Sequence, residues 1–343
     1  MRVLERLDEL YAIGDGPGAN RAAYSAEEDA AHELAAAWMR EAGLEAEWDE
    51  AGNLVGRLRG TQPELGELWT GSHLDSVPQG GRFDGALGVV AGIEAVARLG
   101  PQERTLGVVA FRGEEVGCLG SRACCERRLP LPELFVELHV EQGPRLARAG
   151  APLAVVPAIV GYVRGEFRCE GRAGHAGTTP MEDRDDALVT AARRILELRE
   201  AALEIPDAVF TVGQLSVEPG GVNVIPAAVT FSVDARAPDR ERLDRLVSAI
   251  GFEPSLRVEP VAMDDEVIAA GRAALEELGL PVVELASGAG HDAGILAAAG
   301  VRAAMLFVRS LNGGVSHSPD ELSSDEDVVL GVDALERTLR RLA

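Results

Sequence analysis

The chain of 343 residues contains no lysine, so all 33 of its basic residues are arginine. The absence of lysine excludes catalysis through a lysine Schiff base and phosphate binding by a P-loop lysine. Positive charge is scarce overall, because 56 acidic residues give the chain a formal net charge of −23. A surface of this charge repels polyanions, so we expect neither nucleic acid nor a membrane as a partner.

Long apolar runs and paired cysteines are also lacking. No stretch approaches the roughly 20 uninterrupted apolar residues that a membrane span needs, and the charged segment 1–10 does not resemble a secretion signal. Cys118, Cys124, Cys125 and Cys169 lack the spacing of a zinc ribbon, and a chain of this length folds without disulfides. We therefore expect reduced thiols and a cytoplasmic protein.

Short apolar runs that alternate with helical patterns predict an α/β fold with a largely parallel sheet. A capping box from Ser25 to Glu28 predicts a helix that extends to about residue 42. The expected strands cover residues 53–58, 67–72, 106–111, 134–138 and 303–308, and further helices are expected at 85–99 and 266–278.

The stretch 158–263 has a different order of elements, with a strand, a helix at 186–202, paired strands around a turn at 219–221, and another helix. We therefore expect a smaller inserted α+β domain at 158–263. The flanking residues, 1–157 and 264–343, would form one discontinuous domain that contains the largely parallel sheet.

Histidines and acidic residues lie where the expected strands end. His73 and His139 each end a strand, and Asp84 lies just before a helix. The pair Glu114 and Glu115 follows the strand 106–111. Because the carboxyl ends of neighbouring parallel strands meet at one edge of a sheet, these side chains can converge on one crevice.

Imidazoles combined with carboxylates suit zinc, and also manganese, cobalt or nickel. Asp84 can bridge two ions, and one member of the pair Glu114 and Glu115 can ligate metal while the other acts as a general base toward water. Each feature alone also has a structural explanation, since Glu-Glu pairs are common on solvated surfaces and His-x-Asp can be a structural hydrogen bond. Their combination and order favour the metal hypothesis.

Eight motifs occur in a fixed order along the chain. They are Gly-Ser-His-Leu-Asp-Ser-Val at 71–77, Gly-Gly-Arg-Phe-Asp-Gly at 80–85, Glu-Glu at 114–115, Glu-Leu-His-Val-Glu-Gln-Gly-Pro at 137–144, Gly-His-Ala-Gly-Thr-Thr-Pro-Met at 174–181, Val-Asn-Val-Ile-Pro at 222–226, Gly-Ala-Gly-His-Asp-Ala at 288–293 and Ser-His-Ser-Pro-Asp-Glu at 316–321. Together they resemble the hydantoinase/carbamoylase family of zinc amidases, which includes N-carbamoyl-L-amino-acid hydrolases, β-ureidopropionases and allantoate amidohydrolases.

The resemblance implies two divalent metal ions, zinc foremost, with Glu114 as the general base. The implied ligands form two groups that share one carboxylate: His73, Asp84 and His139 in the first group, and Asp84, Glu115 and His317 in the second.

It also implies a homodimer in which the inserted domain serves as lid and dimerisation module. His175 would then complete the active site of the partner subunit, where it would act in catalysis. His291 matches a family motif and is expected to contact substrate; the structural alternative is that Asp292 orients it.

Gln142, Asn223 and Arg236 match substrate-contacting positions of the family. Arg236 offers a planar two-donor fork to a carboxylate, and the two amides offer both donors and acceptors to a ureido group. The structural alternative for Arg236 is a surface ion pair with Asp234 or Asp239.

The implied reaction is hydrolysis of the carbamoyl C–N bond of a small carboxylate-bearing substrate, foremost an N-carbamoyl-L-amino acid. Allantoate is the alternative substrate, and an aminoacylase or dipeptidase of the same clan is the alternative enzyme. His139 favours the amidase branch, because the peptidase branch typically has a carboxylate there. A catalytically inactive binding protein would not need Glu114. The segment 116–133 is shorter than the family pattern, so the resemblance does not define the mouth of the pocket or the identity of the substrate.

Overall fold

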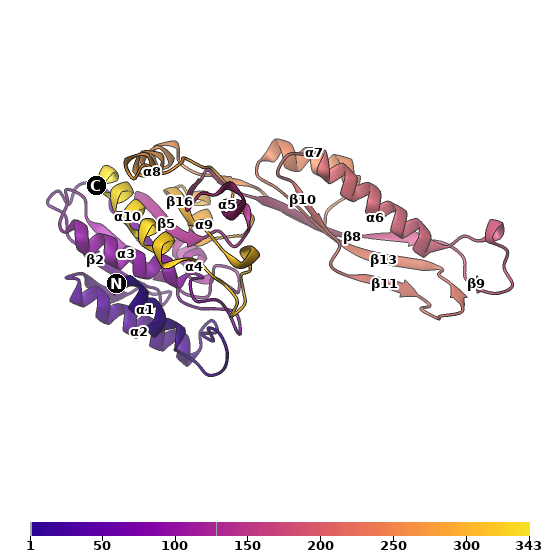
Figure 1. Cartoon of the computed structure of the whole chain (residues 1–343), viewed down its shortest axis with the longest axis horizontal. Helices are drawn as coiled ribbons and strands as arrows, with labels where there is room; N and C mark the ends of the chain where they lie inside the picture. Colours follow the sequence, from indigo (N-terminus) through magenta and orange to yellow (C-terminus); the bar gives the residue numbers. More distant parts are fainter. Residues whose placement is uncertain (1, 128) are drawn as a thin grey trace. The chain divides into compact units, whose positions relative to one another are not determined.

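The computed structural model describes residues 2–127 and 129–343, which belong to two compact units (Figure 1). Unit 1 comprises the chain up to Pro157 together with Ala262–Ala343, and unit 2 comprises Ala158–Val261. Unit 2 therefore interrupts unit 1 once. The second boundary lies at 261–262, where the sequence predicts 263–264.

Unit 1 contains eight α-helices and seven strands among the described residues. The helices are α1 (Arg2–Tyr11), α2 (Ala26–Glu41), α3 (Ala86–Leu99), α4 (Leu119–Arg127), α5 (Arg145–Ala149), α8 (Asp265–Glu277), α9 (Asp292–Ala298) and α10 (Asp325–Leu342), with a 3-10 turn at η2 (Asn312–Gly314). The strands are β1 (Glu45–Trp48), β2 (Leu54–Leu58), β3 (Leu68–His73), β4 (Leu106–Phe111), β5 (Leu134–Val140), β6 (Leu153–Val156) and β16 (Arg302–Val308).

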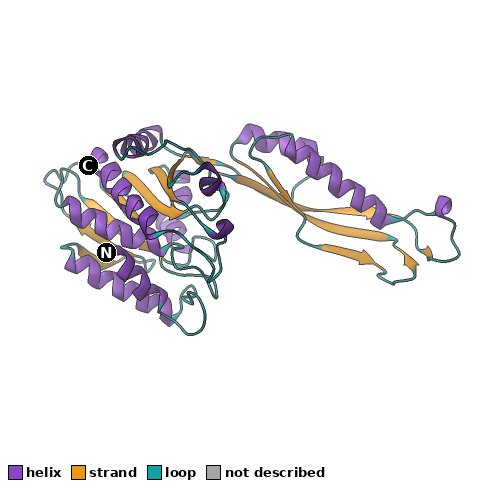
Figure 2. Ribbon diagram, in the orientation of Figure 1, coloured by secondary structure: helices purple, strands orange, loops and turns teal. Residues whose placement is uncertain are grey.

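These strands form one mixed sheet in the order β1-β2-β4-β3-β5-β16-β6. The four central strands, β4, β3, β5 and β16, are parallel, and the three outer strands pair antiparallel. Every residue of β3, β4 and β5 is buried, as expected for parallel strands that are covered on both faces. Helices α3, α8, α9 and α10 pack against this sheet (Figure 2). The prediction of an α/β fold with a mostly parallel central sheet is confirmed.

The N-terminal capping box has one feature that the sequence did not reveal. Ser25 Oγ accepts a hydrogen bond from the Glu28 amide, as the motif predicts. The Glu28 carboxylate, however, accepts hydrogen bonds from the backbone N–H groups of Tyr24 and Gly113. Glu28 therefore ties helix α2 to the turn that precedes Glu114.

Unit 2 contains a five-stranded antiparallel sheet and two long helices, and two small strand pairs accompany them. Its elements are β7 (Ala158–Ile159), β8 (Gly161–Glu170), β9 (Gly174–His175), η1 (Met181–Asp183), α6 (Ala187–Leu203), β10 (Val209–Thr211), β11 (Leu215–Glu218), β12 (Val224–Ile225), β13 (Ala228–Ala237), α7 (Arg240–Ile250), β14 (Leu256–Val258) and β15 (Val261–Ala262). The sheet runs β10-β13-β8-β14, with β11 also paired to β13, while β9 pairs with β12 and β7 with β15.

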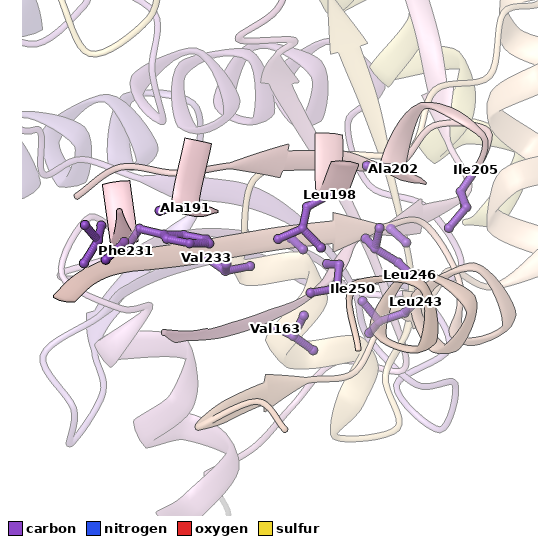
Figure 3. Packing of buried hydrophobic residues seen from close by; sticks show 14 residues of the cluster. Val163, Ala191, Leu198, Ala202, Ile205, Phe231, Val233, Leu243, Leu246 and Ile250 are labelled. Atoms are coloured by element: carbon purple, nitrogen blue, oxygen red, sulfur yellow. The ribbon is translucent and has the colours of Figure 1, made fainter. Parts of the chain in front are cut away.

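The core of unit 2 lies between this sheet and its helices (Figure 3). Leu198 of α6 and Leu246 of α7 pack with Phe231 and Val233 of β13. Residues of β13 alternate between buried and partly exposed positions, because side chains of a strand point to opposite faces. The face of the sheet that carries Arg236 is therefore the face opposite the helices.

No helix in the described part of the chain is both long and apolar enough to cross a membrane. All four cysteines are free thiols, as the sequence predicts.

Candidate metal centre and active site

The parallel strands of unit 1 bring the predicted ligands to one edge of the sheet. His73 is the last residue of β3, and His139 lies near the end of the adjacent strand β5. Glu114 and Glu115 lie in the turn that follows β4, on the other side of β3. Asp84 lies just before α3. The carboxyl ends of these strands converge because the strands are neighbours and run in the same direction.

The first group of side chains is buried. The Asp84 Oδ1 atom lies 3.2 Å from His139 Nε2 and 3.7 Å from His73 Nε2. Potential ligand atoms of these three residues all lie within 4.8 Å of one another.

The second group uses the other oxygen of the same carboxylate. His317 Nε2 lies 3.4 Å from Asp84 Oδ2 and 3.4 Å from Glu115 Oε2. Half of the His317 side chain is exposed, so this group lies at the open side of the centre. Asp84 therefore presents one oxygen to each group, which is the arrangement of a carboxylate shared by two cations.

The distances fit metal coordination. Ligand atoms about 2.0–2.1 Å from a tetrahedral zinc ion are about 3.3–3.4 Å apart, and the distances above lie close to this value. Glu115 Oε1 is buried and has no hydrogen-bond partner. A buried carboxylate oxygen without a donor is costly in the protein alone, whereas a cation would satisfy it.

Hydrogen bonds at the Nδ1 atoms of His73 and His139 determine which ring nitrogen carries the proton in the neutral ring. His73 Nδ1 lies 3.1 Å from the backbone oxygen of Asp75, and His139 Nδ1 lies 2.9 Å from that of Val140. A carbonyl oxygen can only accept, so each Nδ1 carries the proton. In a neutral ring Nε2 then has a lone pair, and in both residues Nε2 faces Asp84. Hydrogen bonds of this type orient histidine ligands in metal sites.

Asp75 is a buried carboxylate to which the sequence analysis assigned no role. Its Oδ1 lies 3.3 Å from His73 Nδ1 and accepts the Glu114 N–H, while Oδ2 accepts the Glu115 N–H. The His-x-Asp spacing was the available signal for this contact. One carboxylate thus fixes His73 and the backbone of both glutamates.

The pKa values of the clustered side chains reflect the mutual contacts of carboxylates and imidazoles in this site. Burial would raise the pKa of Asp84, but contacts with His139 and His317 hold it well below its usual range. Burial opposes protonation of His139, yet Asp84 raises the pKa of His139 to about 9. Contact with Asp84 also raises the pKa of His317 to about 9. In the protein alone these imidazoles balance the carboxylates, and divalent cations would take over that role.

Glu114 belongs to neither group of candidate ligands. Its side chain is about one-eighth exposed, with Oε2 3.8 Å from His73 Nε2 and Oε1 3.7 Å from Cys118 Sγ. Burial raises the pKa of Glu114 to about 7, despite the opposing effect of His73. A carboxyl group poised near neutrality beside a metal centre is suited to general acid-base chemistry.

Gly85 allows the close packing of this centre. It has a φ of 63°, which favours glycine, and an added Cβ would lie 2.4 Å from the His73 ring. Any larger residue at this position would displace His73.

Gln142 and His291 lie beside the candidate metal ligands, within unit 1. Gln142 Nε2 donates to Asp84 Oδ2 at 2.9 Å. His291 is buried with its ring centroid 4.5 Å from that of His139, and its Nδ1 has no partner. Asp292 Oδ1 accepts a hydrogen bond from Ser121, whereas Asp292 Oδ2 is buried without a partner, so Asp292 and His291 Nδ1 do not hydrogen-bond to each other.

A further group of potential ligands contains Glu137, His139 and His291. Both oxygens of Glu137 already accept hydrogen bonds, from Ser72 Oγ at 2.6 Å and from the Ala293 amide at 2.9 Å. This group therefore lacks the free carboxylate oxygen that the second group has.

In unit 2 the structure brings His175 and Asn223 together. His175 of β9 pairs with Val224 of β12, and the Asn223 carbonyl accepts the Ala176 N–H. His175 Nδ1 accepts a hydrogen bond from the Gly177 amide at 3.0 Å. The proton of a neutral His175 ring is therefore on Nε2, and this exposed side chain offers a hydrogen-bond donor.

Arg236 forms the ion pair that was the structural alternative for it. Its Nε donates to Asp234 Oδ1 at 2.8 Å, and its guanidinium lies over the Tyr162 ring. Arg164 donates a hydrogen bond to the same Asp234 carboxylate, and its guanidinium also lies over the Tyr162 ring. Asp239 instead caps helix α7.

The sequence of this chain is similar to those of known proteins over nearly its whole length. The family model "Peptidase family M20/M25/M40" matches residues 69–341. An N-carbamoyl-L-amino acid amidohydrolase from Geobacillus stearothermophilus is 38% identical over 403 aligned positions, covering 100% of this chain and 98% of that protein. An allantoate amidohydrolase from Bacillus subtilis is 35% identical, covering 99% of this chain and 96% of that protein.

The fold is shared as well. The crystal structure of a hydantoinase/carbamoylase family amidase from Burkholderia ambifaria superimposes with a TM-score of 0.90 at 28% identity, covering 100% of this chain and 97% of that one. The resemblance inferred from the sequence motifs is confirmed. The Geobacillus alignment has 403 positions for 343 residues, so at least 60 positions have no counterpart here. On the match to the family model and to full-length relatives, the chain belongs to peptidase family M20/M25/M40.

Proposed function

We propose that the protein is a cytoplasmic two-metal amidohydrolase that cleaves the carbamoyl C–N bond of an N-carbamoyl-L-amino acid. The observation that carries the proposal is the position of Asp84, with one carboxylate oxygen toward each group of potential ligands. The relatives named for hydrolysis of N-carbamoyl amino acids and of allantoate support the reaction class. Zinc is the proposed metal, because two of the three side chains in the first group are imidazoles.

Two divalent ions held by these groups would supply Lewis acidity, which lowers the pKa of water and polarises a carbonyl group. Glu114 accepts a proton from the attacking water and delivers one to the leaving nitrogen. Its burial and its pKa of about 7 suit it to both transfers at neutral pH. The products are the amino acid, ammonia and carbon dioxide.

Three side chains are proposed to recognise the substrate. Gln142 lies beside Asp84 and is proposed to contact the ureido group. Asn223 is proposed to contact it as well. Arg236 is proposed to bind the substrate carboxylate, for which its ion pair with Asp234 holds the guanidinium in place.

Replacing Arg236 with alanine is expected to weaken the binding of carboxylate substrates by about 1.5 to 3 kcal/mol, or roughly 10- to 150-fold. The loss should appear mainly in KM if the contact is equally strong in the ground and transition states. Arg164→Ala is a matched control, because Arg164 binds the same Asp234 and Tyr162 groups. Equal kcat/KM values for the two variants would leave Arg236 as a surface ion pair only.

We also propose a homodimer formed through unit 2, which acts as a lid. Helix α6 exposes Val189, Leu196 and Leu203, which are 46%, 61% and 62% exposed. Their spacing of seven residues places them on one stripe of the helix, where a second copy would cover them. His175 from each lid would then donate a hydrogen bond at the metal centre of its partner.

A substrate panel tests the proposed reaction. Purified protein supplied with zinc, manganese or cobalt is incubated with N-carbamoyl-L-amino acids, N-carbamoyl-β-alanine, allantoate, N-acetyl amino acids and dipeptides, with ammonia and amino acid as readouts. We expect the N-carbamoyl-L-amino acids to give the highest kcat/KM. A higher value for allantoate would change the substrate, and cleavage of dipeptides or N-acetyl amino acids alone would reject the ureido reaction.

A further inference from the structure

Glu321 connects the loop that carries Asp84 with the loop that carries His317. It is 6% exposed, and its Oε1 accepts hydrogen bonds from the backbone amides of Phe83 at 2.8 Å and Asp84 at 3.2 Å. Its Oε2 accepts the hydroxyl hydrogen of Ser316 at 2.9 Å. Ser316 immediately precedes His317, so one buried carboxylate joins the Asp84 loop to the His317 loop.

The Ser316 hydroxyl has a second acceptor within reach. Its Oγ lies 3.4 Å from Asp84 Oδ2, the oxygen that faces His317. A hydroxyl group has one hydrogen and can donate it to one acceptor at a time. The shorter distance to Glu321, 2.9 Å against 3.4 Å to Asp84, keeps the hydrogen on the Glu321 side. Asp84 Oδ2 then accepts from Gln142 Nε2 and faces His317 Nε2, and no hydroxyl hydrogen points at it.

We propose that Glu321 is a positioning residue that fixes Asp84 and keeps the Ser316 hydroxyl hydrogen away from Asp84 Oδ2. This oxygen is thereby left available to the cation of the second group. The inference rests on the proposed two-metal function and deepens it, because it assigns the control of one of the two sites to a residue outside both ligand groups.

The substitution Glu321→Gln separates these roles. The amide oxygen can still accept the Phe83 and Asp84 N–H groups, whereas the amide nitrogen cannot accept from Ser316. The hydroxyl hydrogen then turns to Asp84 Oδ2, where it competes with a cation. We expect the affinity of the second group to fall about 10- to 100-fold, the usual range for lost outer contacts of metal ligands. The first group faces Oδ1 and should change little.

Two further variants test the same mechanism. Gly81→Ala would place a Cβ 2.1 Å from Glu321 Cδ and displace the carboxylate without changing its charge. This variant should also lower the affinity of the second group for its ion while the first group changes little. In the double variant Glu321→Gln/Ser316→Ala the competing hydroxyl is absent, so we expect tight binding of an ion in the second group to be restored.

The experiment measures bound zinc per chain at a series of buffered free zinc concentrations, together with the thermal unfolding midpoint of the metal-free proteins. Glu141→Gln is the matched control, because the Glu141 carboxylate also accepts two backbone N–H groups, those of Arg145 and Leu146. We expect two tightly bound ions in the wild type, the control and the double variant, and one tight and one weak ion in Glu321→Gln.

Two tight ions in Glu321→Gln would overturn the inference and leave the proposed function intact. Equal weakening of both ions with a lowered unfolding midpoint would reduce Glu321 to a general structural role. Failure of the double variant to recover the second ion would reject the role of the Ser316 hydroxyl. A wild type that binds fewer than two ions would instead contradict the proposed function itself.

Discussion

Glu114→Gln is expected to lower kcat by roughly 10²- to 10⁴-fold while the protein keeps both metal ions. The side chain lies beside the candidate metal centre but belongs to neither of the two groups of potential ligands that share Asp84. Glutamine has nearly the same shape, so the fold and the ligands should be preserved. It cannot accept and return a proton, and the loss should therefore appear in kcat.

Glu115→Gln is the comparison that makes this result specific. Glu115 Oε2 lies 3.4 Å from His317, and its Oε1 is buried without a partner. Loss of its charge should weaken metal binding in the second group. Metal analysis of both variants decides the assignment. If Glu114→Gln lost an ion and Glu115→Gln kept two, the roles of the two glutamates would be reversed.

His175→Ala is expected to lower the rate by roughly 10²- to 10³-fold without loss of metal, the usual cost of removing a donor to a developing oxyanion. The hydrogen bond from Gly177 to His175 Nδ1 places the ring proton on Nε2, as such a donor requires. Because the proposed dimer places this donor at the partner's metals, the defect should be complemented between chains.

The complementation test combines two inactive proteins, His175→Ala and Glu114→Gln, which are dissociated and reassembled in equal amounts. In a mixed two-fold dimer, one site receives intact Glu114 and intact His175, and the other receives neither. Random pairing should therefore restore about a quarter of all sites. Each variant reassembled with itself is the control. Verified mixed dimers without recovery would place His175 outside the partner's active site.

The central sheet and the meeting of His73, Glu114 and His139 could be predicted from the sequence, because parallel strands have a simple geometric rule. Each residue lies at or just after the carboxyl end of its strand, and the strands are adjacent in the sheet. No such rule places His317, which lies in a loop with a φ of 54°. Its approach to Asp84 was expected only from the resemblance to known amidases.

Contacts that hold the candidate ligands in place could not be predicted from sequence patterns. Asp75 binds the amides of two residues that lie 39 and 40 positions later, and Glu321 binds amides more than 230 positions earlier. Such hydrogen bonds depend on the packed positions of loops, which periodicity does not encode. Helix α4 was not predicted for a similar reason, since its short run of small and polar residues has no clear apolar period.

The central claim is that this centre hydrolyses a carbamoyl C–N bond with the help of bound metal. The most direct measurement is ammonia release from N-carbamoyl-L-amino acids by purified protein, before and after dialysis against a chelator, with the bound ions counted in the same samples. We predict that activity is lost with the ions and returns when zinc, manganese or cobalt is added. Full activity in rigorously metal-free protein would contradict the account.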